Sequence, residues 1–97
     1  MPAAHRNTDD RACGATTIVI GQSTVFVNGL LWAVDGDIDT HCDPKGPLDP
    51  SGSTVFIEGK NVVVVGDGFY APDFQPPDCL VVHSPTAATG SGDVSAY

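Results

Sequence analysis

Cysteine and histidine side chains recur along this chain in segments rich in turn-forming residues. Cys13, His41 and Cys79 come from three successive parts of the sequence, and His83 stands four residues after Cys79, beyond a short apolar stretch. Thiolate sulfur and imidazole nitrogen are ligands that zinc prefers, and a closed set of four ligands indicates a structural site. The sequence therefore predicts one structural zinc ion held by Cys13, His41, Cys79 and His83.

Two further residues of the same types compete for this site. Cys42 is adjacent to His41, and because neighbouring residues seldom reach one ion together, we expect it to pack as a small apolar side chain. His5 is expected to be an ordinary surface or packing histidine. Three cysteines cannot all pair within one chain, so a complete disulfide framework is excluded. Separate buried or free thiols remain the alternative to a metal site.

The segments that must position these ligands repeat along the chain. Residues 23–29 return at 53–59 with an offset of 30, and both copies contain Ser-Thr-Val-Phe followed by a second branched apolar residue. Each copy leads to an aspartate, Asp37 or Asp67, and Asp9 stands 28 residues before Asp37. We expect these acids to bond backbone amides in turns rather than to act in catalysis or bind calcium. Three units in sequence indicate a pseudo-threefold object closed at one point by a metal.

The composition favours short strands. Eleven Gly and eight Pro mark many turns, while Val, Ile, Phe and Thr fill the segments between them. We expect strands at 16–20 and 23–28 joined by a hairpin at 21–22. We expect a second pair at 53–58 and 61–65, and a last strand at 80–82. Phe26 and Phe56 occupy equivalent repeat positions and are predicted to lie in the core.

Length and charge limit the function classes. A chain of 97 residues is expected to form a single domain over 1–97, with a core small enough to benefit from a bound metal. The formal net charge of -8 argues against nucleic-acid binding, which needs a basic patch. Neither a signal peptide nor a transmembrane helix is expected. No serine stands in a nucleophile motif, so the sequence predicts no enzyme.

The repeated units resemble those of the PAAR-repeat proteins, which cap the spikes of type VI secretion systems and contractile phage tails. The resemblance rests on Pro-Ala-Ala-His-Arg at residues 2–6, on the units 23–29 and 53–59, and on Gly-Asp at 36–37 and 66–67. It implies an all-β, conical fold of three pseudo-threefold repeats. It also implies an apex that carries a bound metal, generally zinc held by His and Cys.

The resemblance further implies the partner and the role of the chain. We expect a non-enzymatic tip that sits as one copy on a trimeric β-helical spike, sharpens it, and makes transient contact with a target membrane. Val63 is predicted to contact the spike, and Trp32 is predicted either to contact it or to lie in the core. The expected location is the phage tail spike or the secreted type VI apparatus. A carrier of secreted effectors and a free-standing zinc-binding adaptor are the alternatives, although residues 90–97 are too few to form a toxin domain.

Overall fold

The structure, a computed structural model, describes residues 2–50 and 54–96 and is all-β, as predicted; this part of the chain contains no helix. Ser53, where the second repeat was predicted to begin, lies outside the described residues. Within these residues, ten two-residue strands are connected by turns and by segments with isolated β-bridges. In chain order they are β1 Thr17–Ile18, β2 Phe26–Val27, β3 Leu30–Leu31, β4 Ile38–Asp39, β5 Leu48–Asp49, β6 Phe56–Ile57, β7 Lys60–Asn61, β8 Gly68–Phe69, β9 Asp73–Phe74 and β10 Val82–His83.

Three extended segments, residues 3–7, 31–35 and 61–65, close on one another through backbone hydrogen bonds. In one ring, the amides of His5, Ala33 and Val63 donate to the carbonyls of Val63, His5 and Ala33, over 3.0, 2.9 and 2.9 Å. In a second ring, the amides of Asn7, Asp35 and Val65 donate to the carbonyls of Leu31, Asn61 and Ala3, over 2.8, 2.9 and 2.8 Å. Each segment therefore pairs with both others, which gives the fold its pseudo-threefold axis.

Three equivalent turns follow these segments. In each turn, an aspartate Oδ2 accepts the backbone amide three residues earlier: Asp9 from Arg6 at 2.8 Å, Asp37 from Val34 at 2.7 Å and Asp67 from Val64 at 2.9 Å. The predicted turn-forming role of these acids is confirmed. A positive φ precedes each acid, and it is supplied by Gly36, by Gly66 and, in the first turn, by Thr8.

Two equivalent hairpins lie at one end of the molecule. β2 pairs with β3 and β6 with β7, around Asn28-Gly29 and Glu58-Gly59, where both residues of each turn have positive φ. The hairpin predicted at residues 21–22 is wrong. β1 pairs instead with β4, and Asp37 Oδ1 accepts the amides of Ile20 and Gly21, so that connection is anchored to the Asp37 turn.

The core consists mainly of small and branched side chains on the three closed segments. The larger cluster contains Trp32, Val34, Val62 and Val64, together with Val27 and Ile57 from the hairpins. Phe26 and Phe56 precede Val27 and Ile57, and since successive strand residues point to opposite faces, both rings project outward. They are 60% and 59% exposed, so the prediction that they are core residues is wrong.

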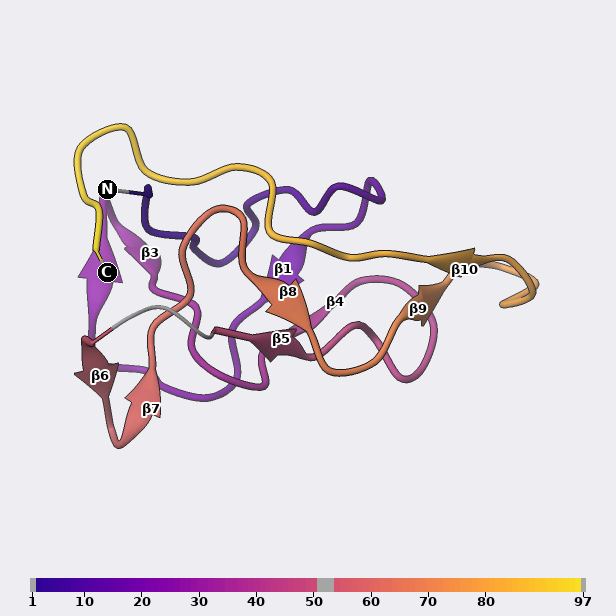
Figure 1. Cartoon of the computed structure of the whole chain (residues 1–97), viewed down its shortest axis with the longest axis horizontal. Helices are drawn as coiled ribbons and strands as arrows, with labels where there is room; N and C mark the ends of the chain where they lie inside the picture. The colour runs from indigo at the N-terminus through magenta and orange to yellow at the C-terminus, as the bar shows by residue number, and fades with distance from the viewer. Residues whose placement is uncertain (1, 51–53, 97) are drawn as a thin grey trace.

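The molecule is elongated, with its two kinds of hairpin at opposite ends (Figure 1). The β9–β10 hairpin lies at one end of the long axis, and β6 and β7 lie at the other. Both ends of the described chain lie at the same end of the molecule as β6 and β7, and there Ala3 bridges Ser95 and the Ala96 amide donates to the Pro2 carbonyl. Within the described residues, no helix has the length and apolar character needed to cross a membrane.

His5 lies on the first closed ring and is completely buried. Its Nδ1 donates to the Thr89 carbonyl at 2.7 Å, and its Nε2 accepts from the Thr17 hydroxyl at 2.5 Å, an arrangement that requires the neutral imidazole. Burial lowers the pKa of His5 to about 4. Of the two expected roles for His5, surface or packing, the structure shows packing.

The buried His5 predicts a specific loss of stability in acid. Its folded pKa lies below the unfolded value, so the stability is present above about pH 6.5 and is lost as the pH falls toward 4. When the pH falls from 7 to 4.5, we expect the burial of neutral His5 to lower the free energy of unfolding by about 2 to 3 kcal/mol. Urea unfolding of wild type and His5→Gln at both pH values measures this; equal losses in the two proteins would contradict it.

Candidate metal centre

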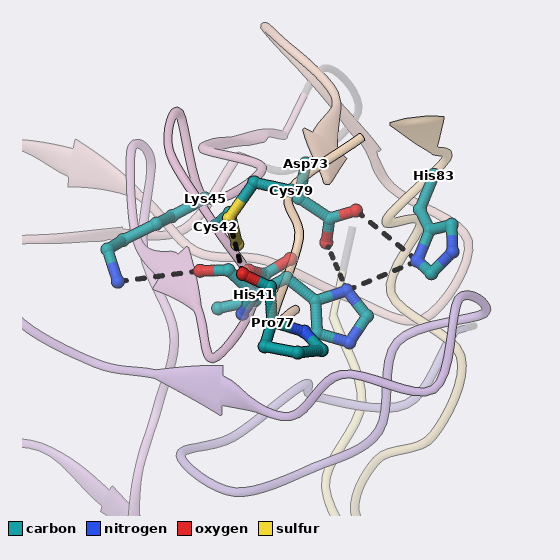
Figure 2. Close-up of a disulfide and its surroundings, with 8 residues drawn as sticks. His41, Cys42, Lys45, Asp73, Pro77, Cys79 and His83 are labelled. Atoms are coloured by element: carbon teal, nitrogen blue, oxygen red, sulfur yellow. Dashed lines mark hydrogen bonds and ion pairs between the residues drawn. A yellow bond between two sulfur atoms is a disulfide. The ribbon is translucent and has the colours of Figure 1, made fainter. Parts of the chain in front are cut away.

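Four potential metal ligands converge near the β9–β10 end. Cys13 stands in the turn before β1, His41 follows β4, Asp73 begins β9 and His83 ends β10. One ligand atom from each lies within 4.8 Å of the others, and we call these four residues the metal group. Figure 2 shows the carboxylate of Asp73 directed toward the rings of His41 and His83.

Four of the distances that separate potential ligand atoms in the metal group are close to those of a zinc site. His41 Nδ1 lies 3.1 Å from Asp73 Oδ2, 3.2 Å from His83 Nδ1 and 3.8 Å from Cys13 Sγ. The Cys13 Sγ to Asp73 Oδ2 distance is 3.3 Å, and His83 Nδ1 lies 3.7 Å from Asp73 Oδ1. Zinc bonds of about 2.0 to 2.3 Å imply ligand separations of about 3.3 to 3.8 Å. One sulfur, two imidazole nitrogens and one carboxylate oxygen are therefore spaced to hold one such ion.

The carboxylate of Asp73 is also kept ionised, as a ligand requires. Burial alone would raise the pKa of Asp73, but hydrogen bonds from Asp39, Cys13 and His41 outweigh burial and lower it. Burial and the hydrogen bond to Asp73 raise the pKa of Asp39 to about 6. Of these two buried carboxyls, Asp39 is therefore the one that takes up a proton first as the pH falls, and Asp73 stays ionised to lower pH.

A buried oxygen of Asp73 is a second observation that favours a bound cation in the metal group. Asp73 Oδ1 is buried, and no hydrogen-bond partner lies within reach of it among the described residues. A buried carboxylate oxygen without a partner is costly, and a bound cation would satisfy it. Burial raises the pKa of the Cys13 thiol, whereas coordination would remove its proton.

The buried side chain of Arg11 contacts the segments that carry the metal group. Arg11 Nη1 donates to the carbonyls of Gly46 and Pro85 at 2.9 and 2.8 Å, and Arg11 Nε donates to the Thr17 hydroxyl at 2.5 Å. The guanidinium also lies 3.7 Å from Asp39 Oδ2. Arg11 therefore ties the loop after His41 and the segment after His83 to the first repeat.

The structure brings together Cys13, His41 and His83 of the four predicted ligands. It joins Cys79 to Cys42 in a disulfide, so neither sulfur belongs to the metal group, and Asp73 completes the set. Asp73 was not predicted, because the zinc site was inferred from sulfur and imidazole ligands alone. The spacing could have indicated Asp73. Cys13 and His41 each stand four residues after the turn aspartate of their repeat, and in the third repeat Asp73 stands six residues after Asp67 whereas Cys79 stands twelve after it.

The two predicted partner contacts, Trp32 and Val63, both lie inside the protein. Trp32 is 8% exposed and donates its indole N–H to the Val63 carbonyl at 2.9 Å, and the side chain of Val63 is fully buried. Neither residue offers appreciable surface to a partner in this structure. A charged substitution at Val63 would therefore destabilise the core before it reported on docking.

Comparison with known proteins identifies one family. The family model of the PAAR motif matches residues 8–70, which is more than half of the chain. No curated protein matches the sequence.

Loss of a ligand from the metal group should reduce both metal content and stability. We expect Cys13→Ala and Asp73→Ala each to weaken zinc binding by at least about 100-fold, because a ligand matters at least as much as an outer-shell partner. The melting temperature should fall with the lost metal. Elemental analysis, competition with a chelator and thermal unfolding measure these effects.

The matched control is Asp78→Ala, which removes an exposed acid from the same hairpin connection. It should leave zinc affinity unchanged. Full metal content in folded Cys13→Ala and Asp73→Ala, indistinguishable from the control, would disprove the assignment.

Proposed function

The chain belongs to the PAAR motif family, and we propose that it is a non-enzymatic tip that caps the trimeric β-helical spike of a contractile injection apparatus. In this role it sharpens the spike for membrane penetration, either on a phage tail or in type VI secretion. One copy caps three spike chains.

The observation that carries this proposal is the pair of closed hydrogen-bond rings. In each ring, one amide and one carbonyl from each of three segments are used in cyclic order, so a single chain has internal threefold pseudo-symmetry. A trimeric spike ends in three equivalent chains. A pseudo-threefold monomer can therefore present similar strand segments to all three, which a chain without this symmetry cannot do.

The docking surface that we propose is the hairpin face, defined as Val25, Phe26, Val55 and Phe56. All four side chains are exposed, at 37%, 60%, 38% and 59%, and they form two equivalent pairs. The Thr24 hydroxyl donates to Glu58 at 3.1 Å, which links the two hairpins and fixes their spacing. Exposed aromatic side chains on a fixed scaffold are typical of interface hot spots.

The metal group supports the opposite end of the same arrangement. We propose that it holds one structural zinc ion, because four protein ligands in a closed set leave no position for a substrate. The ion would bind together the turn before β1, the loop after β4 and the β9–β10 hairpin. The narrow end would thereby resist deformation despite its small core.

The hairpin face gives a direct test of docking. We expect the double variant Phe26→Asp, Phe56→Asp to bind the terminal fragment of its trimeric spike at least about 30-fold more weakly, since a hot-spot aromatic contributes about 2 kcal/mol. Native mass spectrometry of the wild-type complex should show three spike chains and one tip. Titration calorimetry then measures the affinity of each variant.

The matched control places the same two charges on exposed apolar residues at the other end. Leu80 and Val82 are 80% and 57% exposed, and Leu80→Asp, Val82→Asp should bind the spike like wild type. If the control abolishes binding and the hairpin variant retains it, the proposed orientation is reversed. A three-to-three complex would reject the capping argument.

A further inference from the structure

The Cys42–Cys79 disulfide lies close in the sequence to three residues of the metal group. Cys42 directly follows His41, and Cys79 stands between Asp73 and His83. The bond therefore joins two segments that together carry three of the four potential ligands. In Figure 2 the disulfide lies beside His41 and Asp73, on the side away from His83.

Apart from the disulfide, the contacts of the ligand side chains themselves and the link through Arg11, the described residues show few interactions between these two segments. β9 and β10 pair over two residues each, and the Cys42 amide donates to the Phe74 carbonyl at 3.0 Å. The connection between β9 and β10 has exposed side chains, including Leu80 at 80% and Val81 at 56%. Segments with little buried apolar surface open easily. The covalent bond is therefore a restraint on the ligand geometry in addition to the buried contacts of Arg11.

We propose that Cys42 and Cys79 form a redox site that controls how firmly the protein retains its metal. In the disulfide form, the loop after β4 is fixed to the β9–β10 hairpin and the ion leaves slowly. In the dithiol form, the hairpin opens and the ion leaves faster. This inference rests on the metal site proposed above and is independent of spike docking.

The bond is positioned to react with small thiols and disulfides. Cys79 is exposed and Cys42 is half-buried, whereas Cys13 belongs to the metal group and is not disulfide-bonded. For closure, the Cys79 thiolate attacks a small-molecule disulfide, which releases one thiolate and leaves a mixed disulfide on Cys79. The Cys42 thiolate then displaces the second small thiolate. Two electrons pass to the oxidant, and the two cysteine protons end on the released thiols.

The consequence is a tip that changes with its surroundings. In a reducing compartment the dithiol persists and metal can be loaded or exchanged. In oxidising surroundings the disulfide closes and the loaded ion is trapped. Formation of the disulfide would therefore make the narrow end more resistant to deformation on export, when mechanical load is expected.

The experiment compares zinc release from the full chain in both redox states. Protein purified with zinc is treated with oxidised glutathione or with a phosphine reductant, and alkylation followed by intact mass measurement verifies the thiol count. Release is then followed with a chromogenic chelator. We expect release from the reduced protein to be at least about tenfold faster. The Cys42→Ser, Cys79→Ser variant should release zinc at the faster rate in both conditions.

A cobalt spectrum distinguishes the competing arrangement. With Co²⁺ in place of zinc, the sulfur-to-metal charge-transfer band should have the intensity of one thiolate in both redox states and should disappear in Cys13→Ser. An intensity of two thiolates after reduction would make Cys79 a ligand and overturn the proposal. Equal release rates in folded oxidised and reduced protein would also overturn it while leaving the metal site intact. Absence of zinc from the oxidised protein would refute both.

Discussion

The fold depends on the cyclic backbone pairing of three short segments. Strands of two residues have almost no stability alone, and an open sheet of three would leave two edges unpaired. Here each segment pairs with both of the others, so His5, Ala33 and Val63 each donate to one neighbour and accept from the other. The cyclic pairing therefore stabilises these segments although each strand is very short. It also fixes the hairpins on one side of the rings and the metal group on the other.

The metal group inherits its geometry from this closure through buried polar contacts. The Thr17 hydroxyl donates to His5 on the first ring and accepts from Arg11. Arg11 in turn holds carbonyls of the loops that carry His41 and His83, and it lies beside Asp39, which bonds Asp73. A continuous chain of contacts therefore leads from the ring to the ligands. Because each group is buried, each partner is needed to offset desolvation.

The sequence predicted the features that recur and missed those that occur once. The offset of 30 and the aspartate turns follow from local chemistry, so the closed all-β fold and three members of the metal group could be anticipated. Asp73 and Cys79 lie in the irregular third repeat, where the spacing differs from that of the first two. Cys42 lies in the second repeat, and the sequence alone cannot assign disulfide partners. Phe26 was misplaced because apolar patterning does not distinguish a core from a surface awaiting a partner.

The meeting of the two chain ends restricts how this domain can be extended. Pro2 and Ala96 are hydrogen-bonded to each other, and Ala96 packs with Val27 and Ile57 of the two hairpins, so polypeptide attached before or after them would leave the domain at the hairpin end. In the proposed orientation, such a passenger would lie close to the spike and away from the metal group. The opposite end would then keep its shape whatever the domain is fused to.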